Sequence, residues 1–154
     1  FSFMQLLPLT PNCTIVSSRI LNAPVAHVYQ AFENPEQLKK WWGPHGFTNT
    51  FTDFDLQVGG KWNLIMHGPD GANYNNESVF LIVDKPHRVA WYRLTNPLFH
   101  MLITFEELPD NKTKFTFHMI FETAKECDAI RNYVGDKNEE NFDRLEVVLK
   151  TMNS

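Results

Sequence analysis

Two motifs near the start of the chain constrain its fold most: Trp41-Trp42-Gly43-Pro44, and Val58-Gly59-Gly60-Lys61-Trp62. Proline lacks a backbone N–H and pushes the residue before it out of the helical region. The first motif therefore ends a helix and places two large apolar side chains at its end. Paired glycines allow a sharp turn and a close approach of the backbone, so the second motif predicts a turn that leads into a strand.

Around these motifs the sequence alternates between strand and helix patterns. Thr14 to Leu21 alternates as a strand, and Asn22-Ala23-Pro24 turns the chain into a helix whose apolar face runs to Phe32. A second short helix is expected from Glu36 to Trp41. Turn residues then separate six further strands, which we expect at 47–56, 60–67, 74–84, 87–94, 98–107 and 112–121.

The last thirty residues have a helical pattern, which we expect in two pieces. The first runs over 123–133, Gly135 interrupts it, and Asp136 with Glu139 is typical of a capping box that opens a second piece at about 138–152. In the second piece the charged side chains, Arg144 among them, are expected to face water. The inward-facing side chains are expected to be Phe142, Leu145, Leu149 and Met152.

This order of elements resembles a known family. From Ala23-Pro24 through Trp41-Trp42-Gly43-Pro44 to the C-terminal helix, the sequence is similar to the domain homologous to the C-terminal part of the heat-shock-protein-90 ATPase activator. That domain belongs to the START-like, helix-grip or SRPBCC superfamily. The resemblance covers Thr14 to Met152 and implies an α+β fold: a seven-stranded curved antiparallel sheet around a long C-terminal helix, with two short helices between strands 1 and 2.

Composition limits the partners and the number of domains. At 154 residues, we expect one START-like domain over 13–154 and an N-terminal extension over 1–12, in which Phe1-Ser2-Phe3 ahead of Met4 has the character of a non-native remnant. A net charge of −4 with interspersed signs argues against nucleic acid and membrane partners. Without a signal-peptide pattern, the expected location is the cytoplasm, with Cys13 and Cys127 as free thiols.

Geometry and composition together predict a ligand cavity. One helix cannot cover a seven-stranded twisted sheet along its whole length, which leaves a gap between sheet and helix. The chain has 13 Phe and 4 Trp, so the walls of this gap would be wide and apolar unless these side chains are ordinary core. Strand parity counted from Trp62, the tryptophan pair and the inward face of the C-terminal helix together give the expected ligand-binding residues: Trp42, Trp62, Leu64, Met66, Glu77, Val79, Leu81, Trp91, Arg93, Met101, Ile103, Phe117, Phe142, Leu145 and Leu149.

One polar contact is expected in this cavity. If the turn at Lys85-Pro86 sets Val83 opposite Val89, then Leu81 faces Trp91 and Val79 faces Arg93. Glu77 would then lie diagonally next to Arg93. We predict a Glu77–Arg93 contact at the cavity mouth, which would orient a polar group of the ligand.

Parity also assigns residues to the outer, convex face of the sheet. Six large apolar side chains fall on this face, and so many exposed apolar side chains usually mark an interface. We therefore expect either a homodimer through this face or cover from the N-terminal segment, with His100 and His118 on the same side. In a regular strand Phe51 and Phe54 would point to opposite faces, although both are large and apolar. This predicts a bulge between them. The outer apolar residues are Ile65, Phe80, Ile82, Tyr92, Leu102 and Ile120.

These observations favour one function and leave two alternatives. The favoured function is non-enzymatic binding of a small apolar or amphipathic molecule, lipids included, without a cofactor or metal, because no histidine has a partner at metal-ligand spacing. The resemblance implies the first alternative, a co-chaperone-like module with a chaperone partner. The second is a cyclase-like or hydrolase-like enzyme on the same fold, with Glu77, Arg93 or His67 as acid–base groups.

Overall fold

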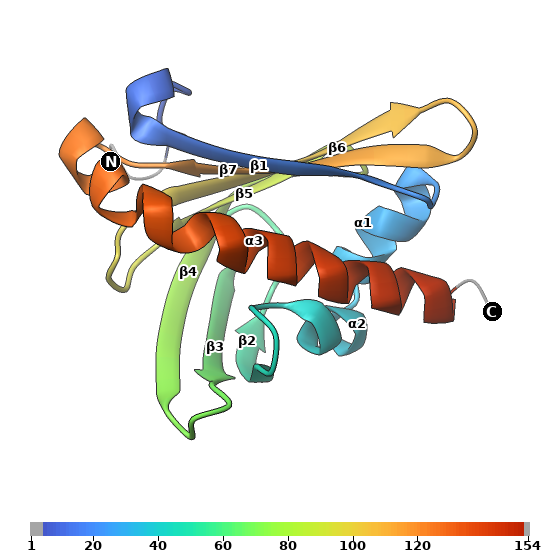
Figure 1. Cartoon of the computed structure of the whole chain (residues 1–154), viewed down its shortest axis with the longest axis horizontal. Coiled ribbons are helices and arrows are strands. Elements are labelled where there is room, and N and C mark those ends of the chain that lie inside the picture. The colour runs from blue at the N-terminus through green and yellow to red at the C-terminus, as the bar shows by residue number, and fades with distance from the viewer. Residues whose placement is uncertain (1–4, 153–154) are drawn as a thin grey trace.

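A seven-stranded antiparallel sheet wraps around one long helix in the computed structural model, which describes residues 5–152 (Figure 1). The prediction for Phe1-Ser2-Phe3 lies outside these residues. Every expected strand and both short helices are present, which confirms the helix-grip fold. The elements are η2 (Pro11–Cys13), β1 (Thr14–Leu21), α1 (Val25–Glu33), α2 (Pro35–Trp41), β2 (Thr48–Phe54), β3 (Lys61–His67), β4 (Asn73–Asp84), β5 (Arg88–Arg93), β6 (His100–Leu108), β7 (Lys112–Ile120) and α3 (Ala124–Met152).

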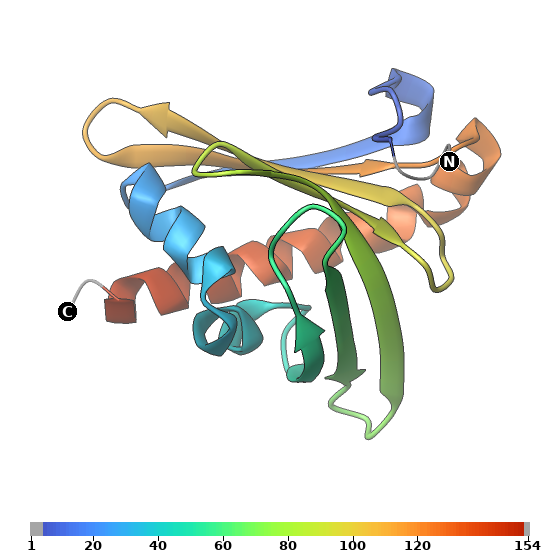
Figure 2. The same ribbon diagram turned by 180° about the vertical axis from the view of Figure 1, so that it is seen from behind.

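The order of the strands explains how the sheet holds the helix. The order is β1-β7-β6-β5-β4-β3-β2, and every neighbouring pair is antiparallel. Figures 1 and 2 show β2, β3 and β4 bending away from the other strands, so that the sheet curves around α3 with α1 and α2 on the same concave side. This inner face carries the main core.

The glycine pair at the start of β3 behaves as its sequence predicts. Gly59 has a φ of +84°, and a Cβ on Gly60 would lie 2.0 Å from the carbonyl oxygen of Asp55. The carbonyl of Gly60 also accepts a hydrogen bond from the Phe80 N–H at 2.9 Å. This turn therefore joins β2, β3 and β4 at one point.

Two bulges interrupt the register of the sheet. The first lies between Phe51 and Asp53, which confirms the bulge expected before Phe54. The second was not expected. Phe80 pairs with Trp91 and Ile82 pairs with Ala90, so Leu81 is an extra residue in β4. A bulge of this kind reverses the parity of every residue on its far side.

The C-terminal helix is continuous, so the prediction of two pieces is wrong. α3 runs from Ala124 to Met152 without a break at Gly135, and no capping box forms at Asp136 and Glu139. Thr123 and Glu126 cap the start of the helix instead. Thr123 Oγ1 accepts a hydrogen bond from the Glu126 N–H at 3.2 Å and donates to the Glu126 carboxylate at 2.9 Å.

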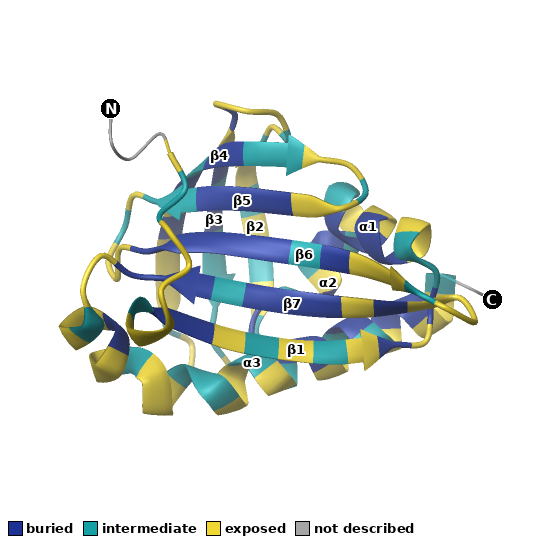
Figure 3. Cartoon of the chain, turned by 90° about the horizontal axis from the view of Figure 1, so that it is seen from above, coloured by how far each residue is buried: buried dark blue, intermediate teal, exposed yellow. Residues whose placement is uncertain are grey.

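The outer face of the sheet carries a second apolar cluster, which the N-terminal segment covers. This outer cluster consists of Leu81, Ala90, Leu102 and Ile120, with Leu6 and Leu7 packed against it. Figure 3 shows the segment before β1 crossing the outer side of the sheet. Cover from the N-terminal segment was one of the two expectations for this face, and it is present. Phe80 was assigned to this face wrongly and lies in the inner core.

His100 fixes this segment to the sheet. The Leu7 N–H donates to His100 Nδ1 at 3.0 Å, and the ring of Tyr92 packs edge-on against the imidazole. Burial lowers the pKa of His100 to about 4, so the ring is neutral at neutral pH and its Nδ1 is free to accept. His100 lies on the outer side of the sheet, as expected, but it is buried there.

No helix in residues 5–152 is long and apolar enough to cross a membrane.

Candidate ligand-binding site

Aromatic rings fill the centre of the inner face. Trp62 lies at the centre of this aromatic cluster. The centroid of its ring is 5.0 Å from that of Trp91, 5.1 Å from that of Trp42 and 5.7 Å from that of Phe32. It also stacks on Phe80 with an interplanar angle of 5°. Three elements meet here, because α1 supplies Phe32, the loop after α2 supplies Trp42, and the sheet supplies the other rings.

The structure brings most of the predicted ligand-binding residues together. Trp42 and Met66 are half-buried at the edge of the inner core. Three other residues, Glu77, Val79 and Leu81, are not on this face, and Leu81 belongs to the outer cluster. The predicted residues that are buried in the inner core are Trp62, Leu64, Trp91, Met101, Ile103, Phe117, Phe142, Leu145 and Leu149.

The predicted Glu77–Arg93 contact is wrong. Val83 does pair with Val89, but the bulge at Leu81 shifts every later pair by one residue. Arg93 consequently faces Ser78, and Val79 faces Tyr92. Glu77 turns to the convex side, where its side chain is exposed. Arg93 remains on the inner side, next to Ser78 and Asn76.

Arg93 finds uncharged partners on the inner face. Its guanidinium donates to the Oδ1 of Asn76, to Thr95 Oγ1 at 3.4 Å, and to the carbonyl oxygens of Asn96 and Pro97 at 3.3 and 3.0 Å. Burial lowers the pKa of Arg93 to about 10. The group therefore still carries its charge at neutral pH, although it sits in a costly place for a charge.

Trp62 has a buried donor without a partner. Its side chain is 1% exposed, and its Nε1–H makes no hydrogen bond with any residue in the described part of the chain. Trp41 differs, because its Nε1–H donates to the carbonyl oxygen of Ala31 at 2.9 Å. Buried polar groups are nearly always paired, so an orphan at the centre of an aromatic cluster marks a candidate site for a ligand's acceptor.

Trp42 stands at the accessible edge of the aromatic cluster. Of the four tryptophans it is the one that is only half-buried. Its ring contacts Trp62, Trp91 and Phe117, while Met66 approaches the neighbouring Gly43 closely enough to meet an added Cβ at 2.8 Å. Solvent thus reaches the aromatic cluster beside Trp42 and Met66.

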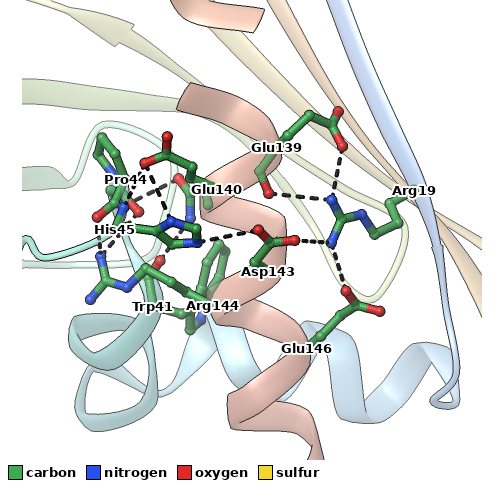
Figure 4. Close-up of polar contacts among 11 residues, drawn as sticks. Arg19, Trp41, Pro44, His45, Glu139, Glu140, Asp143, Arg144 and Glu146 are labelled. Carbon is green, nitrogen blue, oxygen red and sulfur yellow. Dashed lines mark hydrogen bonds and ion pairs between the residues drawn. The ribbon is translucent and has the colours of Figure 1, made fainter. Parts of the chain in front are cut away.

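α3 fixes the backbone of the loop that carries Trp42 (Figure 4). The guanidinium of Arg144 donates to five carbonyl oxygens of this segment at 2.8 to 3.0 Å, from Lys40, Trp42, Gly43, Pro44 and Phe47. Asn141 adds two bonds, donating to the carbonyl oxygen of Trp41 and accepting from the N–H of Gly43. We call this set of contacts the Arg144 clamp.

Arg19 and His45 make further contacts with the same helix. Arg19 of β1 contacts the carboxylates of Glu139, Asp143 and Glu146 at 2.6 to 2.8 Å, and His45 reaches Asp143 at 3.2 Å (Figure 4). The hydrogen bond from Arg19 lowers the pKa of Asp143. α3 is therefore attached both to the edge of the sheet and to the loop after α2.

The sequence reasoning missed Arg144, Asn141 and Asn76 as positioning residues. Arg144 was expected to face water, because it lies beside the apolar stripe of the helix. A polar residue next to such a stripe can instead reach the neighbouring loop, and the buried Asn141 one turn earlier is the matching signal. Asn76 gave no signal, since its inward orientation depends on the bulge at Leu81.

A separate hollow lies on the convex face. It is open to solvent and has a volume of about 720 Å³ between the segment before β1 and the strands β1, β7 and β6. Its lining includes Val16, Leu102 and Thr116 together with Lys114, Glu106 and His118. Burial lowers the pKa of His118. The lining alternates apolar and charged groups, and the described residues include no cluster of three or more potential metal ligands.

The sequence over residues 22–150 matches the family described as "Activator of Hsp90 ATPase homolog 1-like protein". The chain belongs to this family. Its Trp-Trp-Gly-Pro loop and its paired glycines lie inside the matched region, which also includes all but the last two residues of α3. Curated proteins offer no match to this chain.

Solved structures share the fold of this family member. A protein of Nitrosomonas europaea superposes with a TM-score of 0.85 at 22% identity, over 95% of this chain and 99% of its own. A protein of Mycobacterium smegmatis superposes with a TM-score of 0.82 at 26% identity, over 92% of this chain and 93% of its own. An AHSA1 protein of Silicibacter pomeroyi superposes with a TM-score of 0.74 at 17% identity, over 90% of this chain and 99% of its own.

Proposed function

We propose that this protein binds a small apolar or amphipathic molecule between the inner face of the sheet and α3. The observation that supports this most is the unpaired indole N–H of Trp62 inside the aromatic cluster. An unpaired buried donor costs roughly 1–3 kcal/mol. A ligand with one acceptor oxygen would recover that cost, and its apolar body would contact the surrounding rings.

The ligand would enter beside Trp42. In the structure the ring of Trp42 occupies the space next to Trp62, with the two centroids 5.1 Å apart. Its backbone is held by the Arg144 clamp, but its half-exposed side chain can turn outward about its own torsion angles. Binding therefore exchanges the Trp42 ring for the apolar body of the ligand without moving the sheet or α3.

Met66 provides the test of this route. It lies on β3 at the edge of the inner core, whereas its neighbour Ile65, also half-buried, points to the convex face. We expect Met66→Glu to weaken binding of 1-dodecanol about tenfold or more, because a carboxylate would stand beside the apolar route. Ile65→Glu, the matched control, should change the affinity by about twofold or less.

Tryptophan fluorescence measures the affinity of both variants for 1-dodecanol, since a ligand at Trp42 and Trp62 changes the emission of these side chains. Circular dichroism would first show that each variant is folded. Equal affinities of the two variants would contradict the proposed route. Failure of the unaltered protein to respond to 1-dodecanol, up to the solubility limit of the alcohol, would contradict the proposed function itself.

A further inference from the structure

The inner face carries a charge that the aromatic cluster does not need. Arg93 lies there among Asn76, Trp91 and Phe99. We propose that Arg93 is the anchor for the carboxylate head group of an anionic amphiphile, so that the ligand has a carboxylate at one end and an apolar chain at the other. This inference rests on the proposed function and names the class of its ligand.

The bulge at Leu81 keeps acidic groups away from Arg93. Without it, Glu77 would share the inner face with Arg93; with it, Asn76 and Ser78 take those places. No carboxylate within residues 5–152 forms an ion pair with Arg93, whereas Arg19, Arg88 and Arg131 each have at least one. The positive charge of Arg93 is therefore not balanced by the protein.

The contacts of Arg93 can be exchanged for those of a ligand. Two of its acceptors, Asn76 Oδ1 and Thr95 Oγ1, are side-chain atoms that can rotate away, and the contacts to Thr95 and to the carbonyl of Asn96 are long at 3.4 and 3.3 Å. Arg144 differs, because all five of its acceptors are backbone carbonyls at 2.8 to 3.0 Å. Arg93 is thus available for a stronger, charged acceptor.

The register places a second donor beside Arg93. One row of paired residues crosses β2, β3, β4 and β5 on the inner face. It consists of Phe54, Trp62, Ser78 and Arg93. Ser78 is buried and small, and it lies on the strand between those of Trp62 and Arg93, which are about 10 Å apart. The orphan N–H of Trp62 is therefore a second donor in the same row of the inner face as Arg93.

The number of charges favours a carboxylate over a phosphate. One guanidinium matches one negative charge and binds a carboxylate through two parallel hydrogen bonds. The surroundings are apolar: the guanidinium lies 5.2 Å from the ring centroid of Phe99, and Leu64 and Met66 continue the inner face along β3 toward Trp42. An alkyl chain attached to the carboxylate would lie against these side chains.

The test compares dodecanoate with 1-dodecanol, which has the same chain and no charge. The unaltered protein should bind dodecanoate about tenfold more tightly or better, the factor expected of a charge-assisted hydrogen bond. Arg93→Gln should abolish this preference, so that the variant binds dodecanoate and 1-dodecanol with about equal affinity. The matched control is Arg88→Gln, at an exposed arginine of the same strand that pairs with Asp84, and it should keep the preference.

The outcomes distinguish failure of the Arg93 anchor from failure of the proposed function. Equal affinity of the unaltered protein for both probes would overturn the anchor and leave the proposed function standing. A preference for dodecanoate that survives in Arg93→Gln would also overturn it. If neither probe binds, the proposed function fails and the anchor fails with it. The comparison of the two probes on the unaltered protein does not depend on whether Arg93→Gln folds.

Discussion

Replacing Arg144 with methionine is expected to reduce the free energy of unfolding by about 3 kcal/mol. The methionine keeps the apolar stem of the side chain but removes the guanidinium from the Arg144 clamp. Five backbone carbonyls, of Lys40, Trp42, Gly43, Pro44 and Phe47, would lose a charged donor at 2.8 to 3.0 Å. The loop that carries Trp42 would then be held by the uncharged amides of Asn141 and Asn49 and by the carboxylate of Glu140.

Urea unfolding of Arg144→Met measures this loss, with Arg131→Met as the control on the same helix. Arg131 pairs with the exposed Asp128, so its replacement should cost less than about 1 kcal/mol. Similar losses in the two variants would show that the clamp does not hold the loop. Faster hydrogen exchange at the Gly43 N–H, which bonds to Asn141, would locate the effect of Arg144→Met in the loop.

Gly60→Ala is expected to destabilise the protein by about 3 kcal/mol or more, or to prevent folding. The added Cβ would lie 2.0 Å from the carbonyl oxygen of Asp55, a backbone atom that cannot rotate away. Relief of this clash would pull β3 away from β4, because Gly60 accepts the hydrogen bond of the Phe80 N–H. Trp62 and Phe80 at the centre of the aromatic cluster would move with it.

Gly59→Ala separates this steric clash from the general cost of losing a glycine. Gly59 has a φ of +84°, but an added Cβ would meet no atom within 4 Å. Its replacement should cost about 1–2 kcal/mol, the price of a left-handed conformation. Thermal unfolding would show whether Gly60→Ala loses clearly more than Gly59→Ala. Equal losses would contradict the close approach at Gly60.

The fold could be predicted from the sequence because local signals agree with the overall pattern. The strand from Thr14 to Leu21 has the predicted bounds, and the helix break at Trp42-Gly43-Pro44 follows from proline chemistry. Even the bulge after Phe51 was visible, because the two phenylalanines on either side of it violate strict alternation. Where apolar and polar residues alternate, a shift in register leaves a trace in the sequence.

The bulge at Leu81 left no such trace. Phe80, Leu81 and Ile82 are all apolar, so either face of the sheet accepts each of them, and both faces of this sheet are covered. The pattern therefore could not show which residue is the extra one. That single ambiguity placed Glu77 on the wrong side, and with it the predicted partner of Arg93.

The continuity of α3 depends on contacts that sequence reasoning could not weigh. A glycine inside a helix costs about 1 kcal/mol relative to alanine, which favoured a break at Gly135. Cys127 before the glycine and Phe142 after it are both buried in the inner core. The free energy of burying both ends of the helix outweighs the local cost.

The most direct test of the ligand site is the NMR signal of the tryptophan indole N–H groups during titration with 1-dodecanol. The Trp62 N–H should shift downfield as the hydroxyl oxygen of the alcohol accepts its hydrogen bond. The Trp41 N–H should stay in place, since it already donates to Ala31. Saturating alcohol that leaves Trp62 unmoved, or that shifts only convex-face amides such as those of Thr116 and His118, would contradict a ligand site between the sheet and α3.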